Sequence, residues 1–254
     1  MAQITVEEFR NFFKYYKGEE HQIRAIDELY KELDCDFADH LDNNSNWIKT
    51  YRKQDDVVPE GPTSDIEWPL TKQQMAKIMG CSVGSLSDSL MEDYARCIKT
   101  FGMNKLSQIY FLGQCGHESA GLRYPVEIHD GSNYEGRKDL GNIYPGDGVK
   151  FAGTGWIQVT GRYNHQAFSD YLDSIGQSDY RVMDEGKTYT SEVYPWTISG
   201  FWWHLNKMND YCAKYPDVTN SDIDRIGAKV NGRMRPNGAD DRIQYTDVAY
   251  WTLN

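Results

Sequence analysis

Two glutamates, Glu118 and Glu127, are nine residues apart and could carry out acid–base chemistry on a glycosidic bond. Cleavage of such a bond needs one carboxylic acid to protonate the leaving oxygen and a second carboxylate on the far side. In an inverting enzyme the two groups are about 6.5–9.5 Å apart, which leaves room for a water molecule. A glutamate that ends a rigid helix, followed by an irregular loop with another glutamate, can supply this arrangement. Taken alone, two glutamates at this spacing are more often ordinary surface residues.

Three further blocks, read in order, make the pattern specific. They are Tyr-Glu-Gly-Arg-Lys-Asp-Leu-Gly-Asn at 134–142, Pro-Gly-Asp-Gly at 145–148 and Gly-Thr-Gly-Trp-Ile-Gln-Val-Thr-Gly-Arg-Tyr-Asn at 153–164. With the earlier His-Glu-Ser and a late Asn-Gly-Arg, they resemble glycoside hydrolase family 19, which comprises chitinases and phage endolysins. The first two blocks are typical of its bacterial and phage branch. The resemblance covers about residues 69–254 and nothing before them.

The resemblance implies roles for the carboxylates. Glu118 corresponds to the general acid, and Glu127 to the general base at the spacing of the compact bacterial members. Glu135 is a rival base, because the base of plant-type members lies further along the chain. The alternative for Glu135 is a salt bridge with Arg137 or Lys138 that orders its loop.

The resemblance also implies contacts with water and sugar. Thr160 stands where the family has the Ser or Thr that holds the nucleophilic water, and a hydroxyl can both donate and accept for that purpose. Each expected substrate-binding residue could instead be a buried polar group that bonds its own loop, and Trp156 could be a sugar platform or part of the core. The expected substrate-binding residues are His117, Gln158, Tyr163, Asn164, Asn231 and Arg242.

Two departures from the family pattern affect the expected sugar subsites. The usual Arg-Gly-Arg-Gly before the Ile-Gln segment is Ala-Gly-Thr-Gly at 152–155, which removes two cations. The usual late Asn-Gly-Gly is Asn-Gly-Arg at 231–233. Both changes leave the acid and the base in place.

Charge and turn formers divide the chain. Residues 1–68 contain 16 acidic and 8 basic residues, a net −8 of the total −11. Nucleic-acid binding requires clustered Lys and Arg, so this balance argues against it. We expect a helical docking or binding module at 1–52, a linker at 53–68 and a catalytic domain resembling family 19 at 69–254.

Helical periodicity and capping residues predict a mainly α fold. Helices are expected over 71–79, from Ser87 or Asp88 to 98, over 106–118 with one apolar face, over 198–211, and from about 240. Residues 125–165 are rich in Gly, Asp and Asn and predict an irregular stretch with a short β-hairpin. With the resemblance, this order implies a lysozyme-like α-helical domain with long irregular loops.

Several features bear on the compartment and on cofactors. The five cysteines are scattered without a Cys-x-x-Cys pair, which favours free thiols. No His, Cys or Asp cluster shows ligand spacing, so neither a metal nor another cofactor is expected. The N-terminal residues lack the basic and apolar segments of a signal peptide, and no apolar run approaches the roughly 20 residues of a membrane span.

These observations lead to one main hypothesis and two alternatives. The first is hydrolysis of β-1,4 bonds in peptidoglycan by a phage endolysin or virion-associated lysin. Such a protein would be made in the host cytoplasm and reach the wall by holin release or within a virion. The alternatives are a chitinase of the same family and a non-catalytic virion protein that binds the wall. Residues 1–52 would serve to contact virion proteins or the wall.

Overall fold

The computed structural model describes residues 70–233 and 235–254. The expected N-terminal module and linker lie outside the described residues. The chain divides into two compact units, of which the larger comprises Thr63–Asp170 and Arg181–Asn254. In its described part this unit is built from helices and connecting segments, without a strand. The prediction of a mainly α fold is confirmed.

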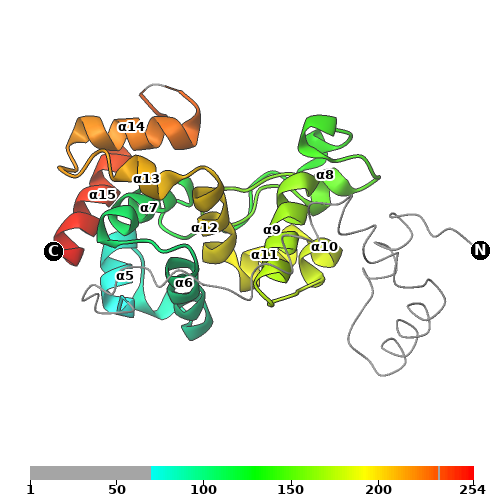
Figure 1. The fold of residues 1–254 in the computed structure, drawn as a ribbon, viewed down its shortest axis with the longest axis horizontal. Coiled ribbons are helices and arrows are strands. Elements are labelled where there is room, and N and C mark those ends of the chain that lie inside the picture. The colour runs from blue at the N-terminus through cyan, green and yellow to red at the C-terminus, as the bar shows by residue number, and fades with distance from the viewer. Residues whose placement is uncertain (1–69, 234) are drawn as a thin grey trace, which may run out of the picture. The chain divides into compact units, whose positions relative to one another are not determined.

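The helices follow the chain order from cyan to red in Figure 1. Short 3-10 turns connect some of them: η2 (Val83–Ser85), η3 (Ser132–Tyr134) and η4 (Lys138–Leu140). The α-helices are α5 (Lys72–Met79), α6 (Asp88–Thr100), α7 (Lys105–Glu118), α8 (Asp147–Lys150), α9 (Arg162–Ser174), α10 (Arg181–Glu185), α11 (Lys187–Val193), α12 (Pro195–Leu205), α13 (Met208–Cys212), α14 (Asn220–Asn231) and α15 (Ala239–Leu253).

Local capping explains where the first helices begin. Thr71 forms a capping box with Gln74, because each side chain binds the other residue's backbone amide. Of the two candidate caps for α6, Ser87 is the N-cap, and its hydroxyl accepts from the amide of Leu90 at 3.1 Å. The Asn104 side chain caps α7 in the same way. These starts are encoded by a few adjacent residues, which is why the sequence predicts them.

Two expectations about secondary structure are wrong. The helix expected over 198–211 is two helices, α12 and α13, because Lys207 between them has a left-handed backbone (φ 52°). The hairpin expected within 125–165 is reduced to two isolated bridges, Val126 with Thr154 and Thr154 with Val159. The helix expected over 106–118 is α7, and it is enclosed on every side, since every residue from 107 to 116 is buried.

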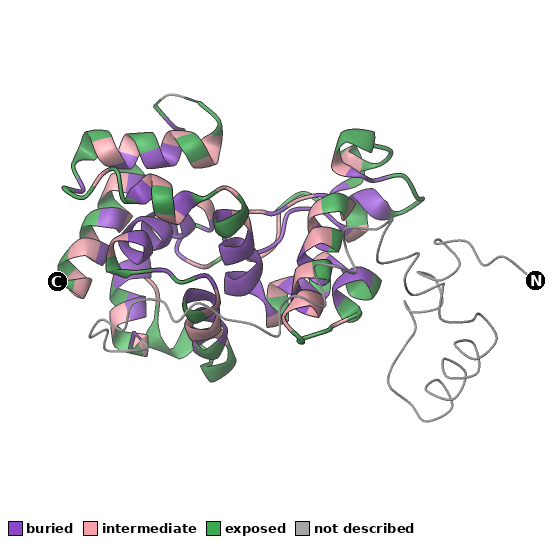
Figure 2. Ribbon diagram, viewed as in Figure 1, coloured by how far each residue is buried: buried purple, intermediate pink, exposed green. Residues whose placement is uncertain are grey.

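Helix α7 is the centre of the core (Figure 2). It packs most extensively against α15, and α12 packs against α6. Aromatic rings fill the space around it: Phe111 of α7 lies 5.2 Å from Trp203 and 6.0 Å from Trp196, measured between ring centroids. A helix enclosed in this way is held rigidly, so the residue at its C-terminus, Glu118, has a defined position.

Two glycines of α7 allow α15 to approach closely. A Cβ atom at Gly113 would lie 2.0 Å from Thr246 Oγ1, and one at Gly116 would lie 2.5 Å from the Tyr245 ring. We therefore expect Gly113→Ala to lower the free energy of unfolding by about 1–3 kcal/mol through overpacking, although alanine normally stabilises a helix interior. Urea denaturation would measure it. Gly84→Ala is the control, since its Cβ would meet nothing nearer than Ser82 Oγ at 3.5 Å. Equal stability of both variants would contradict the close contact.

None of the described helices has the length and apolarity that crossing a membrane requires. The four cysteines in the described part of the chain are free, as their scatter predicts. Burial raises the pKa of the Cys97, Cys115 and Cys212 thiols, so these side chains remain protonated components of the core.

Candidate active site

The chain reverses direction directly after Glu118. The buried Ser119 hydroxyl donates to the Cys115 carbonyl at 2.6 Å and accepts from the Leu122 amide at 2.8 Å. Ala120, Gly121 and Leu122 all have positive φ values, of 51°, 72° and 63°. A Cβ at Gly121 would lie 2.3 Å from the Met79 carbonyl oxygen, so glycine is required there. This strained turn directs the following segment back towards Glu118.

The returning segment is fixed by backbone pairing. The Glu127 amide donates to the Gly153 carbonyl at 2.9 Å, and the Gly155 amide donates to the Pro125 carbonyl at 2.9 Å. The bridge from Thr154 to Val159 then adds the segment that contains Gln158. These short pairings bring three stretches that are separated in sequence to one place.

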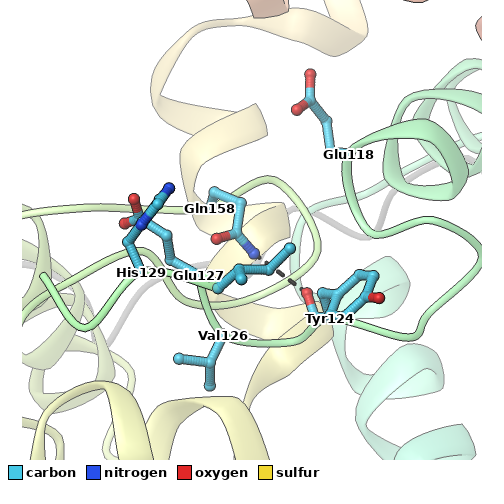
Figure 3. Close-up of a pocket in the computed structure, with 7 residues that line it drawn as sticks. Glu118, Tyr124, Val126, Glu127, His129 and Gln158 are labelled. Atoms are coloured by element: carbon cyan, nitrogen blue, oxygen red, sulfur yellow. Dashed lines mark hydrogen bonds between the residues drawn. The ribbon is translucent and has the colours of Figure 1, made fainter.

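One cavity of about 280 Å³ lies where these stretches meet. Figure 3 shows Glu118 at the end of its helix and Glu127 on the returning segment, with Gln158 between them in this view. The two carboxylates proposed from the sequence therefore line the same cavity. The full lining consists of Glu118, Tyr124, Val126, Glu127, Ile128, His129 and Gln158.

Arg242 of α15 holds the Glu118 carboxylate. Its guanidinium is fully buried and donates to Glu118 Oε1, to Gln114 Oε1 at 2.5 Å and to the Asn237 carbonyl at 3.0 Å. The Glu118 side chain is 23% exposed and lines the cavity. Arg242 was expected to bind substrate, but a buried guanidinium with these partners acts on Glu118 instead.

Two other expected substrate-binding residues also bind neighbouring protein groups. Asn231 ends α14, and its Oδ1 accepts from the Asn237 amide at 3.1 Å, which secures the loop whose carbonyl binds Arg242. The His117 ring nitrogen Nδ1 lies 2.6 Å from Asp241 Oδ2. Helix α15 therefore contacts both residues at the end of α7, through Asp241 and Arg242.

Both oxygens of Glu127 already accept a hydrogen bond. The Tyr134 hydroxyl donates to Oε1 at 2.9 Å, and the Gly153 amide donates to Oε2 at 3.2 Å. A Cβ at Gly153 would lie 3.2 Å from Glu127 Oε2, so this approach favours glycine. Sequence reasoning did not single out Tyr134. The signal was its place at the head of the 134–142 block, whose residues were used only to recognise the family.

Glu135 stabilises a loop. Its two carboxylate oxygens accept from the amides of Gly146 and Gly148, at 2.8 and 2.9 Å. Glu135 thus orders its loop, as the alternative to the base role proposed, but through these amides and not through a salt bridge, since Arg137 pairs with Asp139. Glu135 is not among the residues that line the cavity, which disfavours it as the base.

The remaining expected residues belong to one segment, 158–164, which begins at the cavity with Gln158. Gln158 lines it with a positive φ of 58°, while its amide nitrogen donates to the Tyr124 and Gly155 carbonyls. The Thr160 hydroxyl donates to the Gln158 carbonyl at 2.9 Å, and the Thr160 carbonyl accepts from Asn164 Nδ2 at 2.7 Å. Tyr163 is 61% exposed. Thr160, Tyr163 and Asn164 are outside the cavity lining but continue the same chain segment.

The two residues that replace the family's arginines before the Ile-Gln segment, Ala152 and Thr154, are part of the interior. Ala152 is fully buried, and the buried Thr154 hydroxyl lies 3.0 Å from the Thr190 hydroxyl. Trp156 is 3% exposed and its ring packs 5.6 Å from Trp196, so it belongs to the core and is not a sugar platform. Within the described ranges, no group of three or more His, Cys, Asp and Glu side chains could hold a metal ion.

Comparisons with known proteins agree with the motifs. No protein-family model matches the chain. The chain is 24% identical over 173 residues to a glycosyl hydrolase family 19 domain-containing protein of Haemophilus influenzae, covering 56% of this chain and 78% of that protein. Chitinase C from Streptomyces griseus has a similar structure, with a TM-score of 0.52 and 16% identity over 72% of this chain and 75% of that one. The structure of a chitinase C mutant has a TM-score of 0.51 and 16% sequence identity, and the match covers 72% of this chain and 92% of that one. The resemblance to glycoside hydrolase family 19 is thus supported by a relative named for that family, and the fold is that of the two chitinase C structures.

Proposed function

We propose that this chain hydrolyses β-1,4 bonds of an amino-sugar polymer, bacterial peptidoglycan, with inversion at the anomeric carbon. The observation that carries the proposal is that Glu118 and Glu127 line one cavity of about 280 Å³. The reaction requires a general acid and a general base on either side of the scissile bond, and water is the only co-reactant.

Glu118 is the general acid. Arg242 occupies Oε1, which leaves Oε2 to carry the proton that the leaving oxygen takes. The turn after Ser119 and the packing of α7 against α15 fix the direction of this carboxyl. Positioning of this kind lets proton transfer occur without a search for the correct geometry.

Glu127 is the general base. Each of its oxygens keeps lone-pair capacity after accepting from Tyr134 or Gly153, so either can take a proton from water. The Thr160 hydroxyl donates a hydrogen bond to the Gln158 carbonyl, so its oxygen is free to accept a hydrogen bond from the same water. Gln158 and the exposed ring of Tyr163 are suited to contact the sugar.

The proposed biological setting is bacteriophage lysis, either as a free endolysin or as a virion-associated lysin. The support is the 134–148 block, typical of the bacterial and phage branch of the family. Residues 1–52 would form a separate module that contacts virion proteins or the wall, joined by 53–68 to the catalytic domain at 69–254. The protein would act on the wall after release from the host cytoplasm or from the particle.

A second candidate substrate is chitin, which the similarity to chitinase C favours. The two are separated by incubating the full chain with purified sacculi and with chitin hexamer. Loss of turbidity with β-1,4-cleaved muropeptides, identified by mass spectrometry, supports peptidoglycan; release of chitin oligomers alone supports the chitinase. Proton NMR of the first products should show α-anomers. β-Anomers or 1,6-anhydro products would contradict the inverting mechanism.

A further inference from the structure

We propose that Tyr134 is a positioning residue for the general base: its hydroxyl orients the Glu127 carboxylate and favours the ionised form that takes a proton from water. The inference rests on the proposed function and deepens it. It concerns a side chain outside the motif-based site, since Tyr134 was not among the residues expected to bind substrate or take part in the reaction.

The geometry supports a directed contact. The Tyr134 hydroxyl lies 2.9 Å from Glu127 Oε1, and the Gly153 amide holds the other oxygen at 3.2 Å. Two donors on two different oxygens define the plane of a carboxylate, whereas one donor would leave it free to rotate. Partial burial and then the hydrogen bond to Glu127 raise the pKa of Tyr134. The phenol therefore stays protonated and remains the donor.

Tyr134 is itself held by its backbone. Its amide donates to the Gly131 carbonyl at 2.9 Å, and its carbonyl accepts from Asn142 Nδ2 at 2.9 Å. The buried Asn142 also accepts from the Arg162 amide at the start of α9. Asn142 thus links the loop of Tyr134 to the start of α9, the helix that follows Thr160.

The rest of the 134–148 block reinforces this loop. Glu135 binds the Gly146 and Gly148 amides, and Asp147 accepts from the Ile143 and Tyr144 amides and from Arg162. Glycine is needed at 148, because a Cβ there would lie 2.5 Å from the Glu135 amide nitrogen. These contacts hold the loop that places the Tyr134 hydroxyl beside Glu127.

The chemical consequence concerns the charge of the base. A hydrogen bond donated to a carboxylate favours its ionised form. Tyr134→Phe removes one of the two donors to Glu127 and, with it, part of this preference. Other ionisable groups lie near Glu127 and are the same in the wild type and in a Tyr134 variant: Glu118, Tyr124 and His129 in the cavity, Asp130 and Lys187 beside its loop, and Arg137 beside Tyr134.

The test is Tyr134→Phe in the full chain. We expect kcat to fall about 10-fold or more because the base is misoriented, with KM little changed. The acid limb of the kcat/KM profile should move up by about one pH unit. Carbon-13 NMR titration, with the Glu127 signal assigned by its loss in Glu127→Gln, should show the same upward shift in the Glu127 pKa. If the acid limb or this pKa remains at its wild-type value, the proposal is overturned.

Tyr110→Phe is the matched control. It also removes a single hydroxyl, which donates to the Tyr215 carbonyl at 2.7 Å and contacts neither proposed catalytic carboxylate. Its melting temperature should fall, but its acid limb should stay in place. A limb that moves equally in both variants would show a general loosening of the fold and overturn the proposal. If the wild-type protein releases no product from either polymer, the proposed function fails, and the NMR titration by itself still decides whether Tyr134 acts on Glu127.

Discussion

Glu118→Gln is expected to lower kcat by about 10²–10⁴-fold while the fold is retained. Glutamine has the same size, and its amide oxygen can still accept from Arg242, but it has no proton to give to the leaving oxygen. Product release from the preferred polymer, followed by mass spectrometry, measures the loss. Circular dichroism checks the fold. A variant with wild-type kcat would mean that Glu118 is not the acid, and the non-catalytic wall-binding protein would become the better hypothesis.

The same substitution at two other glutamates identifies the base. Glu127→Gln should lose activity to a similar extent, because the amide cannot take a proton from water. Glu135→Gln should keep kcat within a few-fold, since Glu135 does not line the cavity and its oxygens bind loop amides. The reverse pattern, with activity lost only at Glu135, would transfer the role of base to that residue and contradict the assignment made from the cavity.

Arg242→Met is expected to have the largest effect on stability, a loss of about 3–5 kcal/mol in the free energy of unfolding. The substitution fills similar space but leaves Gln114 Oε1, the Asn237 carbonyl and Glu118 without the guanidinium that binds them. Activity should fall as well, because Glu118 loses its anchor. Urea denaturation provides the free energies, and product release provides kcat.

A double-mutant cycle tests whether Arg242 acts through Glu118. Arg242→Met combined with Glu118→Gln should cost less than the sum of the two single changes, because the unpaired carboxylate is removed together with its partner. Arg137→Met is the control, since its ion pair with Asp139 is exposed at both ends and should contribute little. Strict additivity in the cycle would mean that the buried pair is not energetically coupled.

The sequence by itself determined the features that depend on neighbouring residues. The side chains of Thr71 and Ser87 cap their helices by accepting hydrogen bonds from amides three positions ahead. Helix α7 ends at Glu118, within the His-Glu-Ser segment. The order of the motif blocks was sufficient to recognise the family and to select Glu118 and Glu127. Such features are encoded within a few residues, so no knowledge of distant contacts was needed.

The tertiary structure decided which groups act on those carboxylates. Arg242 reaches Glu118 across 124 positions of sequence, and whether it binds sugar or the acid depends on how deeply α15 packs on α7. Glu135 and Tyr134 are adjacent in sequence, yet one stabilises a loop and the other reaches Glu127. Burial, hydrogen-bond partners and the direction of a side chain arise from contacts between segments far apart in the chain, and a local pattern of residues does not encode them.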